Sequence, residues 1–176
     1  MSDQVTVLQH PALGPIRGIN RVSGVTQYLG VQYASLADRF SRGELLNSYS
    51  PGFSRVHDGV FDATSIGYAT LDLTSDFEEP NWRCRPLPLS PENGCQWEHR
   101  LIQQSLPAPV FDQSDTECLT LNIAVPQGDL DNIPVLALVH GGAFATGSSS
   151  YPQYDLARIV ETSVGMGQPI VAVGIK

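Results

Sequence analysis

The pattern of apolar and polar residues divides the chain into three parts. Residues 1–40 contain alternating or β-branched segments such as QVTVLQH and VTQYLGVQYA, separated by glycine and proline turns, which predict two or three antiparallel strands. Residues 41–113 hold most of the prolines, which lack an N–H and fix φ, so this part is predicted to be mostly irregular, with 70–113 as a Pro-rich loop. From Cys118 onward, apolar runs alternate with polar turns and one helical pattern.

The last part of the chain predicts a strand–helix–strand unit. VLALVH is apolar without alternation, which is typical of a parallel strand covered on both faces. In YDLARIVETS the apolar residues Leu156, Ile159 and Val160 recur at i, i+3 and i+4, which predicts an amphipathic helix with these three on its buried face. Asp155 is positioned to cap that helix. PIVAVGIK is a second apolar strand, so we expect the two strands to run parallel.

The second of these strands ends almost where the chain ends, at Lys176. Interior strands of a parallel sheet need neighbours and need covering layers on both faces. We therefore expect residues 1–176 to be the N-terminal fragment of one longer domain.

Charge and composition exclude several partners. The net charge is -8 and no long basic cluster is present, so nucleic acid is not an expected partner. No apolar run approaches the roughly 20 residues that span a bilayer, so no membrane span is expected. The N-terminus lacks a basic and apolar leader, which favours a cytoplasmic protein, and a secreted one only if the true N-terminus differs.

The three cysteines, Cys84, Cys95 and Cys118, form no C-x-x-C pair, and no histidine stands at metal-ligand spacing. The sequence therefore predicts no metal site and no cofactor. In a cytoplasmic protein the residues alone favour three reduced thiols.

The segment HGGAF, which directly follows VLALV, is the strongest candidate for chemistry. Glycines there expose backbone N–H groups at the carboxyl end of a strand, where ligands of α/β sheets bind. Such a cradle serves phosphate binding or the stabilisation of an oxyanion, and a simple glycine turn remains a third interpretation. The phosphate interpretation fits poorly, because neither common phosphate-binding motif is present and no Lys or Arg lies between His140 and Arg158.

Four groups of residues together resemble the type-B carboxylesterases and lipases, a family of α/β-hydrolases. HGGAFATGSSSYPQYD is similar to the family's oxyanion loop, and TECLTLNIAVP to its E-D-C-L-x-L-N-[IV] signature. GPIRGI with VTQYLGVQYASLADRF resembles its N-terminal strands, and PIVAVGIK the strand that follows the loop. The resemblance implies the N-terminal part of an α/β-hydrolase fold, with short antiparallel strands followed by a βαβ unit of the central sheet. Departures are Thr116-Glu117 for Glu-Asp and Gln32 for a proline.

The resemblance also assigns roles within the loop. It implies that the main-chain amides of Gly142 and Ala143 form the oxyanion hole, with Gly141 as a supporting residue and His140 as a packing and hydrogen-bonding residue. Ala143 replaces the family's third glycine, a mild change because the N–H group is retained. The family pattern further implies a disulfide between Cys95 and Cys118, with Cys84 either free or paired with Cys118 in place of Cys95.

Other parts of the expected machinery are not in this sequence. In the family the nucleophilic serine of G-x-S-x-G, the acid and the base come later, and no G-x-S-x-G occurs here. The serines at 148–150 lack the context of a strand-to-helix elbow and are not predicted nucleophiles. We expect the full-length parent to hydrolyse a small-molecule or lipid ester and this chain alone to be inactive. The alternatives are a non-catalytic binding or adhesion module of the same fold and a nucleotide-binding α/β domain.

Overall fold

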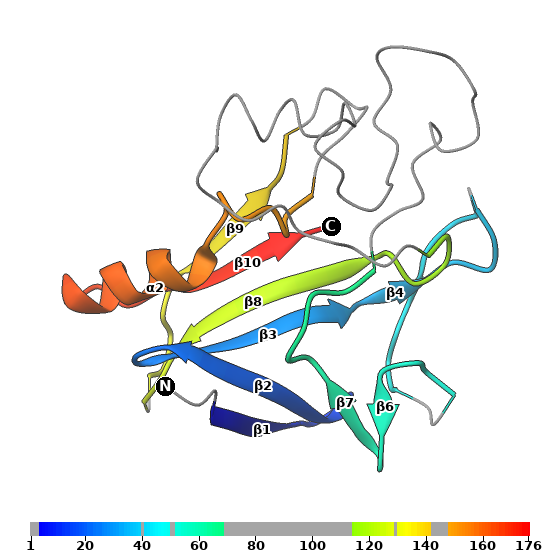
Figure 1. Ribbon diagram of the computed structural model, residues 1–176, viewed down its shortest axis with the longest axis horizontal. Helices are drawn as coiled ribbons and strands as arrows, with labels where there is room; N and C mark the ends of the chain where they lie inside the picture. Colours follow the sequence, from blue (N-terminus) through cyan, green and yellow to red (C-terminus); the bar gives the residue numbers. More distant parts are fainter. Residues whose placement is uncertain (1–3, 40, 50–51, 69–113, 129, 142–147) are drawn as a thin grey trace, which may run out of the picture.

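The described part of the computed structural model is a twisted mixed sheet with helix α2 (Leu156–Gly165) lying against it (Figure 1). Its strand order is β6-β7-β2-β3-β8-β10-β9, with β1 paired to β2. The residues that the structure describes are 4–39, 41–49, 52–68, 114–128, 130–141 and 148–176.

The N-terminal part is an antiparallel meander, as the alternating pattern predicts. β1 pairs with β2 and β2 with β3, and the prediction of two or three antiparallel strands is confirmed. Gly14 and Gly24 occupy the two turns with φ of +81° and +73°, a conformation that glycine adopts without steric cost. The strands are β1 (Gln4–His10), β2 (Gly14–Val22) and β3 (Val25–Gln32).

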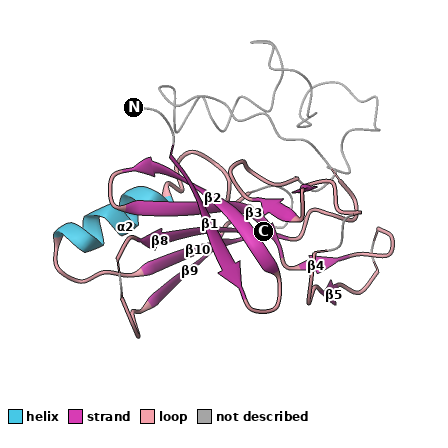
Figure 2. Ribbon diagram, turned by 90° about the horizontal axis from the view of Figure 1, so that it is seen from below, coloured by secondary structure: helices cyan, strands magenta, loops and turns pink. Residues whose placement is uncertain are grey.

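Four very short strands follow within otherwise irregular chain. β4 and β5 form a separate two-stranded ladder, visible in Figure 2, while β7 adds a parallel neighbour to β2. The predicted Pro-rich loop 70–113 lies outside the described residues. The bounds are β4 (Ala34–Ser35), β5 (Glu44–Leu45), β6 (Val56–His57) and β7 (Val60–Asp62).

The C-terminal part contains the predicted strand–helix–strand unit. β10 lies between β8, to which it is antiparallel, and β9, to which it is parallel, and α2 connects β9 to β10. The predicted parallel pairing is confirmed. The elements are β8 (Thr120–Pro126), β9 (Val135–Val139), α2 (Leu156–Gly165) and β10 (Val171–Ile175).

Two apolar clusters lie on opposite faces of β8. Ala124 faces α2, whereas its neighbour Ile123 packs on the other face, as the alternation of a strand requires. The cluster under the helix consists of Val25, Ala124, Leu156, Ala157, Val160 and Ala172. The cluster on the other face has Ile16, Val31, Phe61 and Ala63 as its buried residues.

β9 corrects the prediction of a strand covered on both faces. Val135 and Val139 are 64% and 74% exposed, and Leu136 is 42% exposed. β9 is the edge strand of the sheet and pairs only with β10 among the described elements. An apolar run without alternation identifies a strand suited to burial, but only the neighbouring elements determine whether it is buried.

The buried face of α2 differs from the prediction at one position. Leu156 and Val160 are buried as expected, but Ile159 is 41% exposed, and Ala157 is buried in its place. With about 3.6 residues per turn, Ile159 lies on the flank of the stripe that Leu156 and Val160 define. Leu156, Ala157 and Val160 belong to the apolar cluster under the helix, whereas Ile159 does not.

The predicted cap of α2 is confirmed, and it makes a testable contribution to stability. Asp155 Oδ1 accepts a hydrogen bond from Arg158 N at 3.2 Å. We expect Asp155→Ala to lower the free energy of unfolding by about 1 kcal/mol, measured by urea denaturation. Asp155→Ser keeps a capping oxygen and should retain most of the stability. An equal loss in both variants would contradict a capping role.

The partly buried side chain of Tyr49 is expected to make the stability of the protein depend on pH. Tyr49 stacks on Phe61 with ring centroids 4.1 Å apart and donates a hydrogen bond from its hydroxyl to Gln32 O at 2.6 Å. Burial raises the pKa of Tyr49 to about 12, although the Arg55 guanidinium acts in the opposite direction.

Because the folded-state pKa of Tyr49 exceeds the unfolded value of about 10, its contribution to stability is complete below pH 10. That contribution is lost as the pH rises toward 12. We expect Tyr49→Phe to be less stable at pH 8 by about 1 kcal/mol, the cost of one hydrogen bond, and the difference to shrink at higher pH. Guanidinium denaturation of both proteins from pH 8 to 11.5 measures the difference in their free energies of unfolding. A difference that stays constant with pH would contradict the raised pKa of Tyr49.

Candidate functional site

The candidate site lies at the carboxyl edge of the two parallel strands. Val139 of β9 stands opposite Ile175 of β10 in register, so both strands end at the same edge of the sheet (Figure 1). The chain leaves this edge at His140 and Gly141. The predicted oxyanion amides of Gly142 and Ala143 lie outside the described residues, and their role stays a prediction.

His140 makes a local hydrogen bond to the loop backbone. Its Nδ1 lies 2.9 Å from Gly141 O. A carbonyl oxygen only accepts, so Nδ1 carries the proton in this arrangement. Such a bond suits the hydrogen-bonding role that the resemblance implies for His140.

Gly141 is exposed, and a Cβ added to it would meet no atom within 4 Å. Its φ is not positive, so Gly141 lies outside the left-handed region that favours glycine. Neither the backbone conformation nor packing against the described residues therefore requires glycine here. Among the described residues, no atom fills the space next to Gly141.

The described chain resumes at Ser148 and is held against the same end of the sheet. Ser148 and Ser149 are 4% and 2% exposed, and Ser150 Oγ accepts a hydrogen bond from Asn122 Nδ2 at 2.9 Å. The sequence analysis did not single out Asn122. The feature of the sequence that could have identified Asn122 is a polar side chain within the apolar strand LTLNIAVP. Positions along this strand are alternately buried and half-buried.

The end of β10 is fixed to β8 and to the chain after β3. Lys176 N donates to Thr120 O at 3.0 Å, and Tyr33 Oη donates to Lys176 O at 3.2 Å. Burial lowers the pKa of Lys176 to about 8, opposed by the nearby Cys118. These contacts hold the carboxyl edge together.

Cys118 is buried, and its thiol lies 4.0 Å from Asp115 O. No disulfide joins it to another described residue. Cys84 and Cys95 lie outside the described part of the chain, so the Cys95–Cys118 disulfide stays a prediction.

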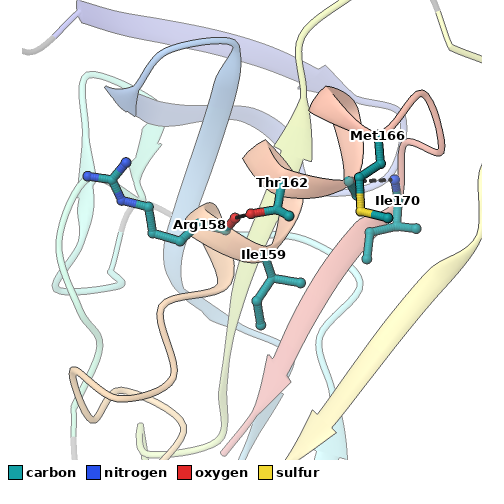
Figure 3. Close-up of a pocket in the computed structure, with 6 residues that line it drawn as sticks. Arg158, Ile159, Thr162, Met166 and Ile170 are labelled. Carbon is teal, nitrogen blue, oxygen red and sulfur yellow. Dashed lines mark hydrogen bonds between the residues drawn. The ribbon is translucent and has the colours of Figure 1, made fainter.

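A hollow of about 410 Å³ opens on the flank of α2 (Figure 3). Ile170 lies at the amino end of β10, whereas the glycine loop, which begins at His140, follows the carboxyl end of β9, beside that of β10. The hollow is therefore at the other end of β10 and is separate from the candidate site. Its lining is Arg158, Ile159, Thr162, Ser163, Met166 and Ile170.

Two other kinds of site have no counterpart among the described residues. No three or more His, Cys, Asp or Glu side chains there are grouped to hold a metal ion. No helix within the described ranges is long and apolar enough to cross a bilayer.

Comparison with known proteins gives a family and several relatives. The model of the carboxylesterase family matches residues 3–175. Lipase 1 of Yarrowia lipolytica is 26% identical over 163 residues, covering 93% of this chain and 27% of that protein. Lipase 1 of Geotrichum candidum is 38% identical over 85 residues, covering 43% of this chain and 15% of that protein.

Solved structures agree in fold. A PNB esterase covers 97% of this chain with a TM-score of 0.62 and 22% identity, and a carboxylesterase of Geobacillus stearothermophilus gives 0.59 and 26%. The α/β-hydrolase fold class is thereby confirmed. The chain spans 27% and 26% of the lengths of these two structures.

Proposed function

Because this chain belongs to the carboxylesterase family, we propose that the protein of which it is part hydrolyses carboxylic esters. A serine attacks the acyl carbonyl, and the amides of Gly142 and Ala143 stabilise the oxyanion that forms. The serine, its base and the acid are supplied by sequence beyond these 176 residues. No cofactor takes part in the reaction.

The observation that supports this proposal best is the open space at Gly141. The glycine follows a strand that ends at the carboxyl edge of the parallel pair, where an α/β fold binds its ligands. An added Cβ there meets no atom of the described residues within 4 Å, so neither packing against them nor a positive φ explains the small residue. Close approach of an acyl group to the main chain explains it.

The substrate class follows from the family and from the relatives. Several of these are lipases, and others are a para-nitrobenzyl esterase of Bacillus subtilis and a phenmedipham hydrolase of Pseudarthrobacter oxydans. For this protein we propose small-molecule or lipid carboxylic esters as substrates.

The test is to express the full-length gene product and assay p-nitrophenyl acetate and p-nitrophenyl butyrate. We expect turnover that is abolished when the serine of its G-x-S-x-G motif is replaced by alanine. Turnover equal to that of the alanine variant would refute the proposal.

The 176-residue chain, assayed in the same way, should give only background hydrolysis. It holds the loop that stabilises charge but no nucleophile paired with a base. If the chain alone hydrolysed these esters and phenylmethylsulfonyl fluoride blocked that hydrolysis, the proposed inactivity would be wrong.

A further inference from the structure

We propose that Asn122 and Ser150 are positioning residues for the glycine loop, acting at the point where the loop returns to the sheet. This inference rests on the proposed esterase function, because it assigns the two residues a role in setting the oxyanion site. It rests on contacts of Gly30, Asn122, Ser149, Ser150 and Gly174, all of which the structure describes.

Asn122 joins two separate segments through one buried side chain. It is 6% exposed and lies on β8, opposite Gly174 of β10. Its Oδ1 accepts a hydrogen bond from Gly30 N at 3.0 Å, where the pairing of β3 with β8 is interrupted by a register shift. Its Nδ2 donates to Ser150 Oγ at 2.9 Å. Both ends of the amide are therefore used, and its orientation is determined.

Ser149 is packed directly on the backbone of β10. A Cβ added to Gly174 would lie 3.1 Å from Ser149 Cβ and 3.2 Å from Leu156 Cδ1. A glycine at 174 thus lets the segment approach the strand closely. Ser149 Oγ is buried and has no hydrogen-bond partner among the described residues, so the contacts shown for this residue are those of its packing and not of its hydroxyl.

Ser150 supplies the directional contact of the same segment. Ser148 Oγ accepts a hydrogen bond from Ser150 N at 3.1 Å, which forms a tight local turn. The bond from Asn122 then ties this turn to β8. One end of the glycine loop is fixed by the β9–β10 ladder, and the Asn122–Ser150 bond fixes the other.

A change in this anchor should affect the transition state more than substrate binding. The oxyanion exists only after the serine has attacked, so a displaced loop lowers kcat and leaves KM nearly unchanged. A displacement of about 1 Å can cost about 100-fold in rate.

The neighbouring serines provide a matched pair of variants in the full-length protein. Ser150→Ala removes the bond to Asn122 and should lower kcat at least 10-fold with KM within twofold. Ser149→Ala removes a hydroxyl that makes no hydrogen bond and should leave both parameters within twofold. Ser150→Thr retains the hydroxyl and should recover most of the activity. Equal kcat values for Ser150→Ala and Ser149→Ala would overturn the proposal.

Hydrogen exchange in the full-length protein tests the anchor without relying on activity. Amides of residues 148–151 should exchange at least 10-fold faster in Ser150→Ala than in Ser149→Ala, with the amides of β8 unchanged. Identical exchange in the two variants would overturn the anchor itself. A full-length protein with no esterase turnover but with this exchange difference would refute the proposed function and leave the anchor standing.

Discussion

Replacing Ala143 with proline in the full-length protein is expected to lower kcat for p-nitrophenyl butyrate by about 100- to 1,000-fold. Proline has no N–H, so the variant removes one of the two proposed oxyanion donors of this chain. Loss of one such donor costs about 2.7–4 kcal/mol of transition-state stabilisation. Because the substrate carbonyl uses the donor weakly before attack, KM should change little.

Ala143→Gly is the matched control, because it keeps the N–H and restores the glycine that the family pattern has at this position. Its kcat should stay within about threefold of the unchanged protein. A proline variant as active as the glycine variant would show that Ala143 N donates nothing to the transition state. Equal circular dichroism spectra of the two variants exclude unfolding as the cause.

Replacing Gly30 with alanine is expected to destabilise the 176-residue chain by about 2–5 kcal/mol, measured by urea denaturation. Gly30 has a φ of +65°, which costs an L-residue about 1–2 kcal/mol. Its added Cβ would also overlap the Arg55 guanidinium and the backbone of Gly67. Overpacking of this kind costs about 1–3 kcal/mol and would disturb the bond of 2.9 Å from Arg55 Nη1 to Gly30 O.

Gly24→Ala separates these two causes. Gly24 has a similar φ of +73°, but a Cβ there meets no atom within 4 Å. The control should therefore lose only about 1–2 kcal/mol, the cost of the backbone conformation. If both variants lost the same free energy of unfolding, the close approach of Arg55 and Gly67 to Gly30 would not contribute to the destabilisation.

Much of the fold was predictable because it depends on local periodicity. Alternation and turn glycines predict the antiparallel strands, and the apolar run before Gly141 and the one that begins at Ile170 predict the parallel pair. The cap at Asp155 follows from a side chain that reaches the first turn of its own helix. For the candidate site, periodicity places the glycine loop at the carboxyl edge, where the structure has Gly141.

Other features depend on residues that are distant in the sequence. The exposure of Ile159 depends on which side of α2 faces the cluster under the helix, and that of Val139 on the edge position of β9. The link from Asn122 to Ser150 joins residues 28 positions apart. No local pattern specifies such a partner, because it is brought near by the pairing of β8 with β10.

The sequence by itself determined the type and direction of the main elements, the helix cap and the family, because these depend on residue spacing and short motifs. Only the tertiary structure decided which apolar faces are covered, why Gly30 admits no side chain, and what holds the return of the glycine loop. The physical reason is that burial and side-chain hydrogen bonds require two surfaces, and strand order determines which surfaces meet.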